Sequence, residues 1–236
     1  MAESQQHFLI TGASSGVGFE TALQLSAEPG NRVFAIARSA DRLDALHTQS
    51  NGKVVTRVFD LMSDDPQVLR EWLIQSGVDA LHGLVHNAGY LVNRSFGDIT
   101  ADELEASYRT NLMAPFQITQ ALLGLLRAAQ GAHVLHISSM GGVQGSVKFP
   151  GLSAYSSSKG ALAVLTECLA CELEPDKISV NCLALGAVQT EMLSKAFPDY
   201  TAPMRPEEMA NCVTWMLCKG HRFFNGKILP ASISTP

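Results

Sequence analysis

The chain has 236 residues, of which 46% are hydrophobic and 17% charged, so it can bury a sizeable core and is not a disordered protein. Its formal net charge of −5 argues against a protein that binds nucleic acid or an acidic membrane surface. There is no apolar run long enough for a membrane span and no signal-peptide pattern, and the five cysteines fit a reducing compartment, so we expect a cytoplasmic protein.

Short apolar runs with β-branched residues alternate with longer stretches of helical spacing along the chain. The runs predict strands over residues 7–10, 32–37, 53–59, 81–86, 133–137 and 178–183, with a short edge strand over 227–229. The helical spacing predicts helices over residues 18–28, 66–76, 101–129 (as two helices), 154–172 and 206–220. This alternation predicts one Rossmann-like domain over residues 1–236, a doubly wound parallel α/β sheet with helices on both faces.

A glycine-rich turn follows the first predicted strand and opens the first predicted helix. Its glycines have the spacing G-x-x-x-G-x-G, which permits positive φ and lets a pyrophosphate reach backbone N–H groups at a helix N-terminus. An ordinary Gly/Ser turn is the alternative, but the position in the chain favours a dinucleotide site. The residues assigned to it are Gly12, Ser14, Ser15, Gly16, Val17 and Gly18.

The end of the second predicted strand indicates which dinucleotide is bound. A carboxylate about 20 residues beyond the glycines usually binds the ribose 2′-hydroxyl of NAD. This chain has Arg38 there, followed by Ser39, and a guanidinium beside a hydroxyl suits a 2′-phosphate. The pattern favours NADP(H) over NAD, and a solvated surface charge is the alternative interpretation of Arg38.

Polar or small residues also follow the third and fourth predicted strands, where ligands bind in such sheets. Asp60 can accept a hydrogen bond from the adenine amino group while Leu61 packs beside it, or Asp60 can cap a turn. Asn87, Ala88 and Gly89 can let the strand end lie under the adenosine ribose, or Asn87 can stabilise the turn alone.

Tyr155 and Lys159 are four residues apart in a predicted helix and therefore share a helix face. A tyrosine with its ordinary pKa of ~10 exchanges protons poorly at neutral pH, and a neighbouring ammonium lowers that pKa. We expect Lys159 to lower the pKa of Tyr155, with the positive nicotinamide of an oxidised cofactor as a second contributor. Chance spacing of an exposed tyrosine and a surface lysine is the alternative.

Two further residues are candidates for the same site. Ser139 follows the fifth predicted strand and can polarise a carbonyl oxygen beside Tyr155. Successive strand residues point to opposite faces, so we prefer Ser139 to Ser138. Asn111 lies between two helical segments, where it indicates either a kink with a bound water or an N-cap.

Taken together, these motifs resemble the short-chain dehydrogenase/reductase family over roughly residues 7–190. The resemblance implies NAD(P)-dependent interconversion of a carbonyl and a secondary alcohol, and assembly as a homodimer or homotetramer. It further implies that Tyr155 is the general acid/base, that Lys159 lowers its pKa and holds the nicotinamide ribose, that Ser139 positions the substrate oxygen and that Asn111 anchors a water. The motifs are Thr11–Gly18, Asn87–Gly89, Asn111, Ser139, Tyr155 with Lys159, and Val180-Asn181.

The chain departs from the family pattern at three places. Ser139 and Tyr155 are 16 residues apart, a few more than is common, so we expect a small insertion beside the pocket. The usual Pro-Gly after the sixth strand is replaced by Leu185-Gly186, and we keep Gly186, Val188 and Thr190 as nicotinamide contacts. The tail over residues 226–235 lacks the usual Asp-Gly-Gly.

The remaining clusters carry less information. Histidine pairs and the Cys-x-x-Cys at 168–171 have no metal-ligand or redox context, so we predict no metal site. Apolar residues after Thr190 are either core or a lid over the substrate, and the resemblance favours the lid. They are Met192, Leu193, Phe197, Tyr200, Pro203 and Met204.

The sequence thus predicts an NADP-dependent oxidoreductase that acts on a small carbonyl or alcohol substrate, with neither nucleic acid nor membrane as a partner. Two alternatives stay open. A narrower one is a reductase of 3-oxoacyl thioesters in the same family. A different one is a dinucleotide-binding regulatory protein without catalysis, for which we would expect an incomplete set of Ser139, Tyr155 and Lys159.

Overall fold

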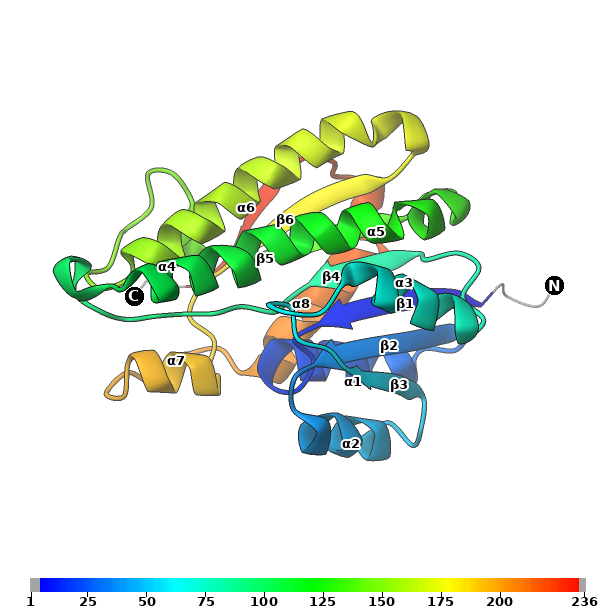
Figure 1. Ribbon diagram of the computed structural model, residues 1–236, viewed down its shortest axis with the longest axis horizontal. Coiled ribbons are helices and arrows are strands. Elements are labelled where there is room, and N and C mark those ends of the chain that lie inside the picture. Colours follow the sequence, from blue (N-terminus) through cyan, green and yellow to red (C-terminus); the bar gives the residue numbers. More distant parts are fainter. Residues whose placement is uncertain (1–4, 234–236) are drawn as a thin grey trace.

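Residues 5–233 are described by the computed structural model, which has a seven-stranded parallel sheet in the order β3-β2-β1-β4-β5-β6-β7 (Figure 1). The chain runs outward from β1 on one side and from β4 on the other, so the carboxyl ends of β1 and β4 form the switch point where ligands bind in such sheets. The strands are β1 (Gln6–Thr11), β2 (Asn31–Ala37), β3 (Val54–Val58), β4 (Gly83–His86), β5 (His133–Ser139), β6 (Ser179–Leu185) and β7 (Ile228–Ala231).

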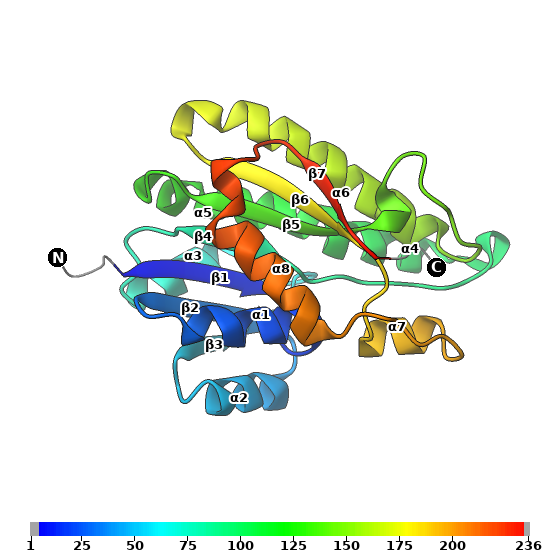
Figure 2. The ribbon, with the colours of Figure 1, turned by 180° about the vertical axis from the view of Figure 1, so that it is seen from behind.

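Helices cover both faces of the sheet. One face carries α1 (Gly16–Ala27), α2 (Ala40–Gln49) and α8 (Pro206–Cys218), as Figure 2 shows. The other carries α3 (Pro66–Gln75), α4 (Ala101–Tyr108), α5 (Ala114–Ala128) and α6 (Ser153–Glu172) (Figure 1). The short α7 (Glu191–Ala196) lies apart from both layers, beyond the carboxyl ends of the strands (Figures 1 and 2).

Except for Gln6 at the start of β1 and Ser139 at the end of β5, every residue of β1, β4 and β5 is buried, because both faces of the sheet are covered. In β1, Phe8 and Ile10 pack with the core under α1 and α8, whereas Leu9 between them packs with the core under α3 and α5. This alternation follows from the two-residue period of a strand. It explains why the sequence shows continuous apolar runs rather than alternating polar residues.

The predicted fold class, a doubly wound parallel sheet, is confirmed, and the predicted strands are present with ends that shift by a few residues. Two helices were not predicted. In α2 only Leu43 and Leu46 are buried, which makes a weak apolar stripe, and α7 has only 6 residues and none buried. The stretch over 101–129 is divided, as expected, by a π-helical turn at Arg109–Met113.

The C-terminal segment completes the sheet without the Asp-Gly-Gly of the family pattern. Strand β7 pairs in parallel with β6, and the Gly186 N–H donates to the carbonyl of Ala231 at 3.0 Å. A methyl group at Gly186 would lie 2.6 Å from Cβ of Ser232, so the segment packs directly on this glycine. Residues 234 and 235 of the tail lie outside the described part.

None of the described helices is long and apolar enough to cross a membrane.

Candidate active site

A cleft of about 1060 Å³ lies at the carboxyl ends of the strands. The loops that follow β1 to β6 all contribute to its wall, as expected for a doubly wound sheet. Of the predicted site residues, Gly18 and Asn111 do not line it. Those that do are Gly12, Ser14, Ser15, Gly16, Val17, Arg38, Ser39, Asp60, Leu61, Asn87, Ala88, Gly89, Ser139, Tyr155, Lys159, Gly186, Val188 and Thr190.

The glycine turn after β1 has the backbone that its sequence predicts. Gly12 and Gly16 have φ of +68° and +59°, a conformation that side chains disfavour. A methyl group at Gly12 would lie 2.6 Å from Cα of Ala88, and one at Gly18 would lie 2.2 Å from Nδ2 of Asn87. Gly18 therefore permits close packing of α1 and does not face the cleft. The open backbone of this turn fits the diphosphate of a dinucleotide.

The end of β4 is tied to the glycine turn. Nδ2 of Asn87 donates to the carbonyls of Thr11 at 3.2 Å and Gly12 at 3.0 Å, and the N–H of Ala88 donates to Oγ1 of Thr11 at 3.1 Å. Asn87 thus stabilises the turn, which is one of the two roles considered for it. These bonds hold Ala88 and Gly89 at the floor of the cleft.

Arg38 and Asp60 lie at the other end of the cleft. Arg38 is exposed and has no ion pair with any residue in the range 5–233. Oδ1 of Asp60 accepts a hydrogen bond from the N–H of Met62 at 3.0 Å, so this carboxylate caps the turn after β3 while it also lines the cleft. A free guanidinium at the end of β2 fits the 2′-phosphate of NADP.

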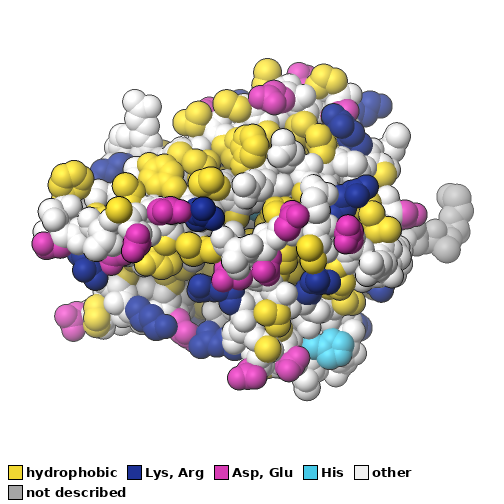
Figure 3. Space-filling model, in the orientation of Figure 1, with side chains coloured by type: hydrophobic (Ala, Val, Ile, Leu, Met, Phe, Trp, Pro, Cys, Tyr) yellow, Lys and Arg dark blue, Asp and Glu magenta, His cyan; other side chains and the backbone are white. Residues whose placement is uncertain are grey.

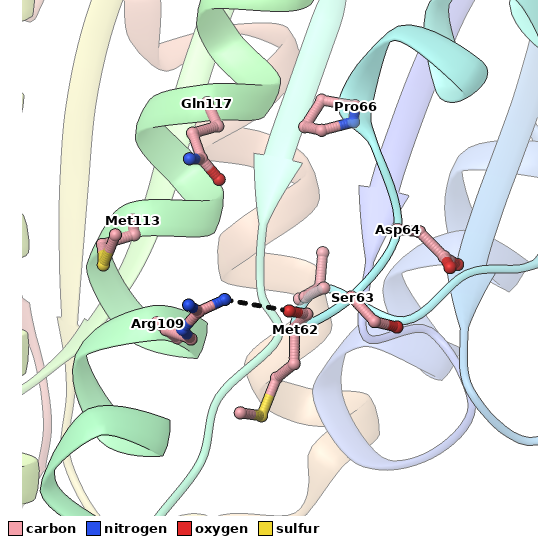
Figure 4. Close-up of a pocket in the computed structure, with 8 residues that line it drawn as sticks. Met62, Ser63, Asp64, Pro66, Arg109, Met113 and Gln117 are labelled. Atoms are coloured by element: carbon pink, nitrogen blue, oxygen red, sulfur yellow. Dashed lines mark hydrogen bonds between the residues drawn. The ribbon is translucent and has the colours of Figure 1, made fainter.

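A smaller cavity of about 250 Å³ adjoins that turn, between residues 61–66 and the start of α5 (Figure 4). Arg109 points across it, and its Nη1 donates to the carbonyl of Met62 at 3.1 Å (Figure 4). The turn after β3 is therefore fastened to the π-helical segment that contains Asn111.

Tyr155 is partly buried in the first turn of α6, and the Ser139 hydroxyl is close enough to act on the pKa of its phenol. Ser138 points elsewhere, because its Oγ donates to the carbonyl of Lys159 at 2.9 Å. The structure thus brings Ser139, and not Ser138, to the phenol. Burial raises the pKa of Tyr155 above its ordinary value, and the bond with Ser139 lowers it. The expectation that Lys159 lowers this pKa is not met in the chain by itself, where burial outweighs the other effects.

Lys159 is almost fully buried, with 3% of its surface exposed. Its Nζ donates to the carbonyl of Ile137 at 2.7 Å and lies 6.0 Å from the centre of the Tyr155 ring. Burial lowers the pKa of Lys159 from 10.5 to about 8. The ammonium form therefore still predominates at neutral pH, on the same side of the cleft as Tyr155.

Asn111 lies in the π-helical turn between α4 and α5 and is fully buried. Its Oδ1 accepts a hydrogen bond from the N–H of Tyr90 at 2.8 Å, and its Nδ2 donates to the carbonyl of Tyr90 and to Oγ of Ser158, both at 2.9 Å. Of the two interpretations considered for Asn111, a kink or an N-cap, the structure has a break in the helix, a π turn of a kind frequent at functional sites. Both atoms of the side-chain amide are thus bonded to Tyr90 and Ser158 within the protein.

Two histidines lie on neighbouring strands below Lys159. Rings of His86 and His136 are 5.3 Å apart between centres, and they pair with hydroxyls of Thr119 and Thr166. Burial lowers the pKa of His136 to about 3 and that of His86 well below its ordinary range, so both stay neutral. Within residues 5–233 no group of His, Cys, Asp or Glu side chains has the arrangement of a metal site.

Several residues that shape the site were not assigned from the sequence. A methyl group at Gly142 would lie 2.7 Å from the main-chain carbon of Lys159, so this glycine lets the turn after β5 pack on α6 and sets Ser139 against Tyr155. Arg42 of α2 also lines the cleft. Its position four residues after Arg38 could have indicated this role if α2 had been predicted.

The segment after Thr190 forms one wall of the cleft. Met192, Leu193, Phe197 and Tyr200 line the cleft, as the lid interpretation requires. Pro203 is exposed away from it, and Met204 packs on the core under α1 and α8. Thr190 caps α7, because its Oγ1 accepts from the N–H of Leu193 at 3.2 Å. We call residues 190–200 the lid.

Comparison with known proteins assigns the family. The family model described as short chain dehydrogenase matches residues 6–201. The chain belongs to the short-chain dehydrogenase family. The resemblance noted in the sequence is thereby confirmed, and the protein is an oxidoreductase by family.

Individual short-chain dehydrogenases are similar over most of the chain. Carbonyl reductase [NADPH] 2 of Sus scrofa is 34% identical over 185 residues, which are 78% of this chain and 72% of that protein. L-xylulose reductase of Mesocricetus auratus is 35% identical over 186 residues, with the same shares of 78% and 72%. The crystal structure of a short-chain dehydrogenase of Shigella flexneri complexed with NADP has a TM-score of 0.88, 26% identity and 97% coverage of both chains.

Proposed function

We propose that this short-chain dehydrogenase interconverts a carbonyl and a secondary alcohol with NADP(H) as its cofactor, and that Tyr155 is the general acid/base. The observation that carries this proposal is the grouping of Ser139, Tyr155 and Lys159 in one cleft, with the Ser139 hydroxyl on the phenol. The reductases similar in sequence support the reaction class. The complete set of three residues disfavours a regulatory protein without catalysis.

The residues that would hold the cofactor all line the same cleft. The glycine turn would receive the diphosphate, Arg38 the 2′-phosphate, and Val188 and Thr190 the nicotinamide end. The bound cofactor would supply the hydride that is exchanged with the substrate carbon. The NADP complex of the similar Shigella protein supports the choice of NADP over NAD.

Tyr155 would transfer the proton on the substrate oxygen. Because burial raises its pKa, the phenol is protonated at neutral pH, which is the form that donates a proton when a carbonyl is reduced. Ser139 would hold the substrate oxygen beside that phenol. Lys159 would keep a positive charge near the phenol and bind the nicotinamide ribose. A water held at Asn111, the role that the family resemblance implies, would return protons to Lys159.

The substrate part of the cleft is largely apolar, which supports a substrate with an apolar or aromatic body next to its carbonyl. Residues from three loops form this wall, and the insertion predicted between Ser139 and Tyr155 would lie in the loop over 143–151. The apolar residues and tyrosines are Tyr90, Leu91, Met140, Phe149, Leu152, Met192, Leu193, Phe197 and Tyr200.

The proposed activity is tested by mixing the protein with NADPH and a panel of ketones, aldehydes and an acetoacetyl thioester while absorbance at 340 nm is followed. We expect turnover of apolar free carbonyls, and Tyr155→Phe should reduce kcat at least about 100-fold because the proton donor is lost. Preferential turnover of the thioester would favour the 3-oxoacyl reductase instead. Equal rates for wild type and Tyr155→Phe would defeat the assignment of Tyr155.

We further propose a homodimer or homotetramer that packs through α4, α5 and α6. Exposed apolar side chains lie on these helices, among them Leu104, Phe116 and Val164, and Figure 3 shows hydrophobic side chains over this face. Light scattering coupled to gel filtration gives the subunit number.

The five cysteines are free thiols, which supports a reducing compartment such as the cytoplasm.

A further inference from the structure

An ion pair joins the cofactor end of the cleft to the lid. Nη2 of Arg42 lies 3.0 Å from Oε1 and 3.1 Å from Oε2 of Glu191. Arg42 belongs to the first turn of α2, and Glu191 is the first residue of α7. Both line the cleft, although they are 149 positions apart in the chain. The contact therefore connects two elements that follow different strands, β2 and β6.

Arg42 and Arg38 are neighbours at this end of the cleft but differ in their partners. Arg38 has no ion pair within residues 5–233, whereas Arg42 is held by Glu191. Arg38, Ser39 and Arg42 line the cleft together. Because Arg42 follows Arg38 by four positions at the start of α2, we expect a phosphate on Arg38 and Ser39 to lie within the reach of its long side chain.

The ion pair is weak enough to be exchanged. The side chains of Arg42 and Glu191 are 46% and 53% exposed, and exposed ion pairs contribute little free energy. A phosphate monoester carries about −1.5 to −2 charges at pH 7 and forms stronger charge-assisted hydrogen bonds with arginine. The phosphate therefore attracts the guanidinium more strongly than the single carboxylate does.

We propose that Arg42 is a second ligand of the cofactor's 2′-phosphate and that Glu191 of the lid competes with the phosphate for it. This inference rests on the proposed NADP(H) function. When the 2′-phosphate binds, Arg42 leaves Glu191. A cofactor without that phosphate leaves the ion pair in place. Glu191 thus weakens the binding of NADPH through Arg42 and has no such effect on NADH, which makes it a determinant of cofactor preference.

The proposal is tested by calorimetric titration of wild type, Arg42→Gln, Glu191→Gln and the double variant. The probes are NADPH, NADH and adenosine 2′,5′-bisphosphate, which carries the 2′-phosphate without a nicotinamide. Arg42→Gln should weaken NADPH and the bisphosphate about tenfold and leave NADH unchanged. Glu191→Gln should tighten NADPH and the bisphosphate roughly two- to fivefold. The double variant should match Arg42→Gln, because the proposal assigns the effect of Glu191 to Arg42 and not to Lys195, whose Nζ lies 4.0 Å from the same carboxylate.

Arg127→Gln is the matched control, because it removes another exposed ion pair, with Asp176 at 2.8 Å, away from the cleft. It should leave all affinities unchanged. If Glu191→Gln increases the NADPH affinity equally with and without Arg42, Glu191 acts on the phosphate by its negative charge alone. That result would overturn the proposed competition. An unchanged NADPH affinity in Arg42→Gln would overturn the inference but not the proposed function. Failure of wild type to bind either cofactor would overturn both.

Discussion

Lys159 donates a hydrogen bond from Nζ to the carbonyl of Ile137 at 2.7 Å, from a position that is only 3% exposed. The main chain of β5 thus holds the ammonium of α6 in place, close to the Tyr155 ring. A buried lysine costs stability, and burial lowers its pKa from 10.5 to about 8. The protein retains this charge at a point where the proposed reaction uses it.

Lys159→Met should be more stable than wild type at pH 7 and inactive. The pKa difference of about 2.5 corresponds to roughly 3 kcal/mol, and loss of the bond to Ile137 removes about 1 kcal/mol of this gain. In wild type, burial of the Lys159 ammonium lowers the free energy of unfolding by its full amount below pH 8. This loss becomes smaller as the pH rises toward 10.5, because the unfolded chain then binds more protons than the folded one. The advantage of about 2 kcal/mol should therefore shrink in urea unfolding at pH 9.5. Lys53→Met, at an exposed position, is the control and should show no pH-dependent difference.

Arg38→Ala should change the cofactor preference. Arg38 is exposed, unpaired within the described range and the first basic residue after β2, so its loss should weaken NADPH binding about tenfold or more. The affinity for NADH should stay within about twofold, because NADH has no 2′-phosphate. Fluorescence titration with both cofactors measures the ratio. An equal loss of both affinities would mean that Arg38 acts on the fold and not on the phosphate.

Gly142→Ala should disturb the site through packing. The added methyl group would lie 2.7 Å from the Lys159 main-chain carbon, so the turn after β5 must move away from α6. We expect a loss of about 1–3 kcal/mol in the free energy of unfolding and a lower kcat as Ser139 moves from Tyr155. Gly124→Ala in α5 is the matched control, since a methyl group there has nothing within 4 Å. It should stabilise the protein by about 0.5–1 kcal/mol.

Gly186→Ala should destabilise the C-terminal strand, and Ser232→Gly should relieve the effect. The new methyl group would lie 2.6 Å from Cβ and 2.1 Å from Oγ of Ser232, and both of these atoms disappear in Ser232→Gly. We expect a cost of about 1–3 kcal/mol for the single change and partial recovery in the double variant. Chemical unfolding of wild type, the two single variants and the double variant gives the coupling free energy between the two positions. If the two losses of stability simply add, the methyl group does not contact Ser232, and the proposed clash is contradicted.

The features of the fold and the site that can be predicted from the sequence are those set by residues close together in the chain. The parallel α/β sheet and the glycine turn follow from continuous apolar runs and from glycine spacing, which are set by neighbouring residues. The spacing of Tyr155 and Lys159 and the strand period that favoured Ser139 are local in the same sense. The break at Asn111 is also local, because the residue interrupts a helical pattern.

Other features required the tertiary structure, because they depend on residues far apart in the chain. The net shift of the Tyr155 pKa is upward, since burial outweighs the effect of Ser139, and both depend on segments that only the fold brings together. The need for glycine at 142 and 186 comes from α6 and the C-terminal segment, and the ion pair of Arg42 with Glu191 comes from the meeting of α2 and the lid. Sequence patterns record periodicity and turn preference, whereas desolvation and close contact arise only when the chain is packed.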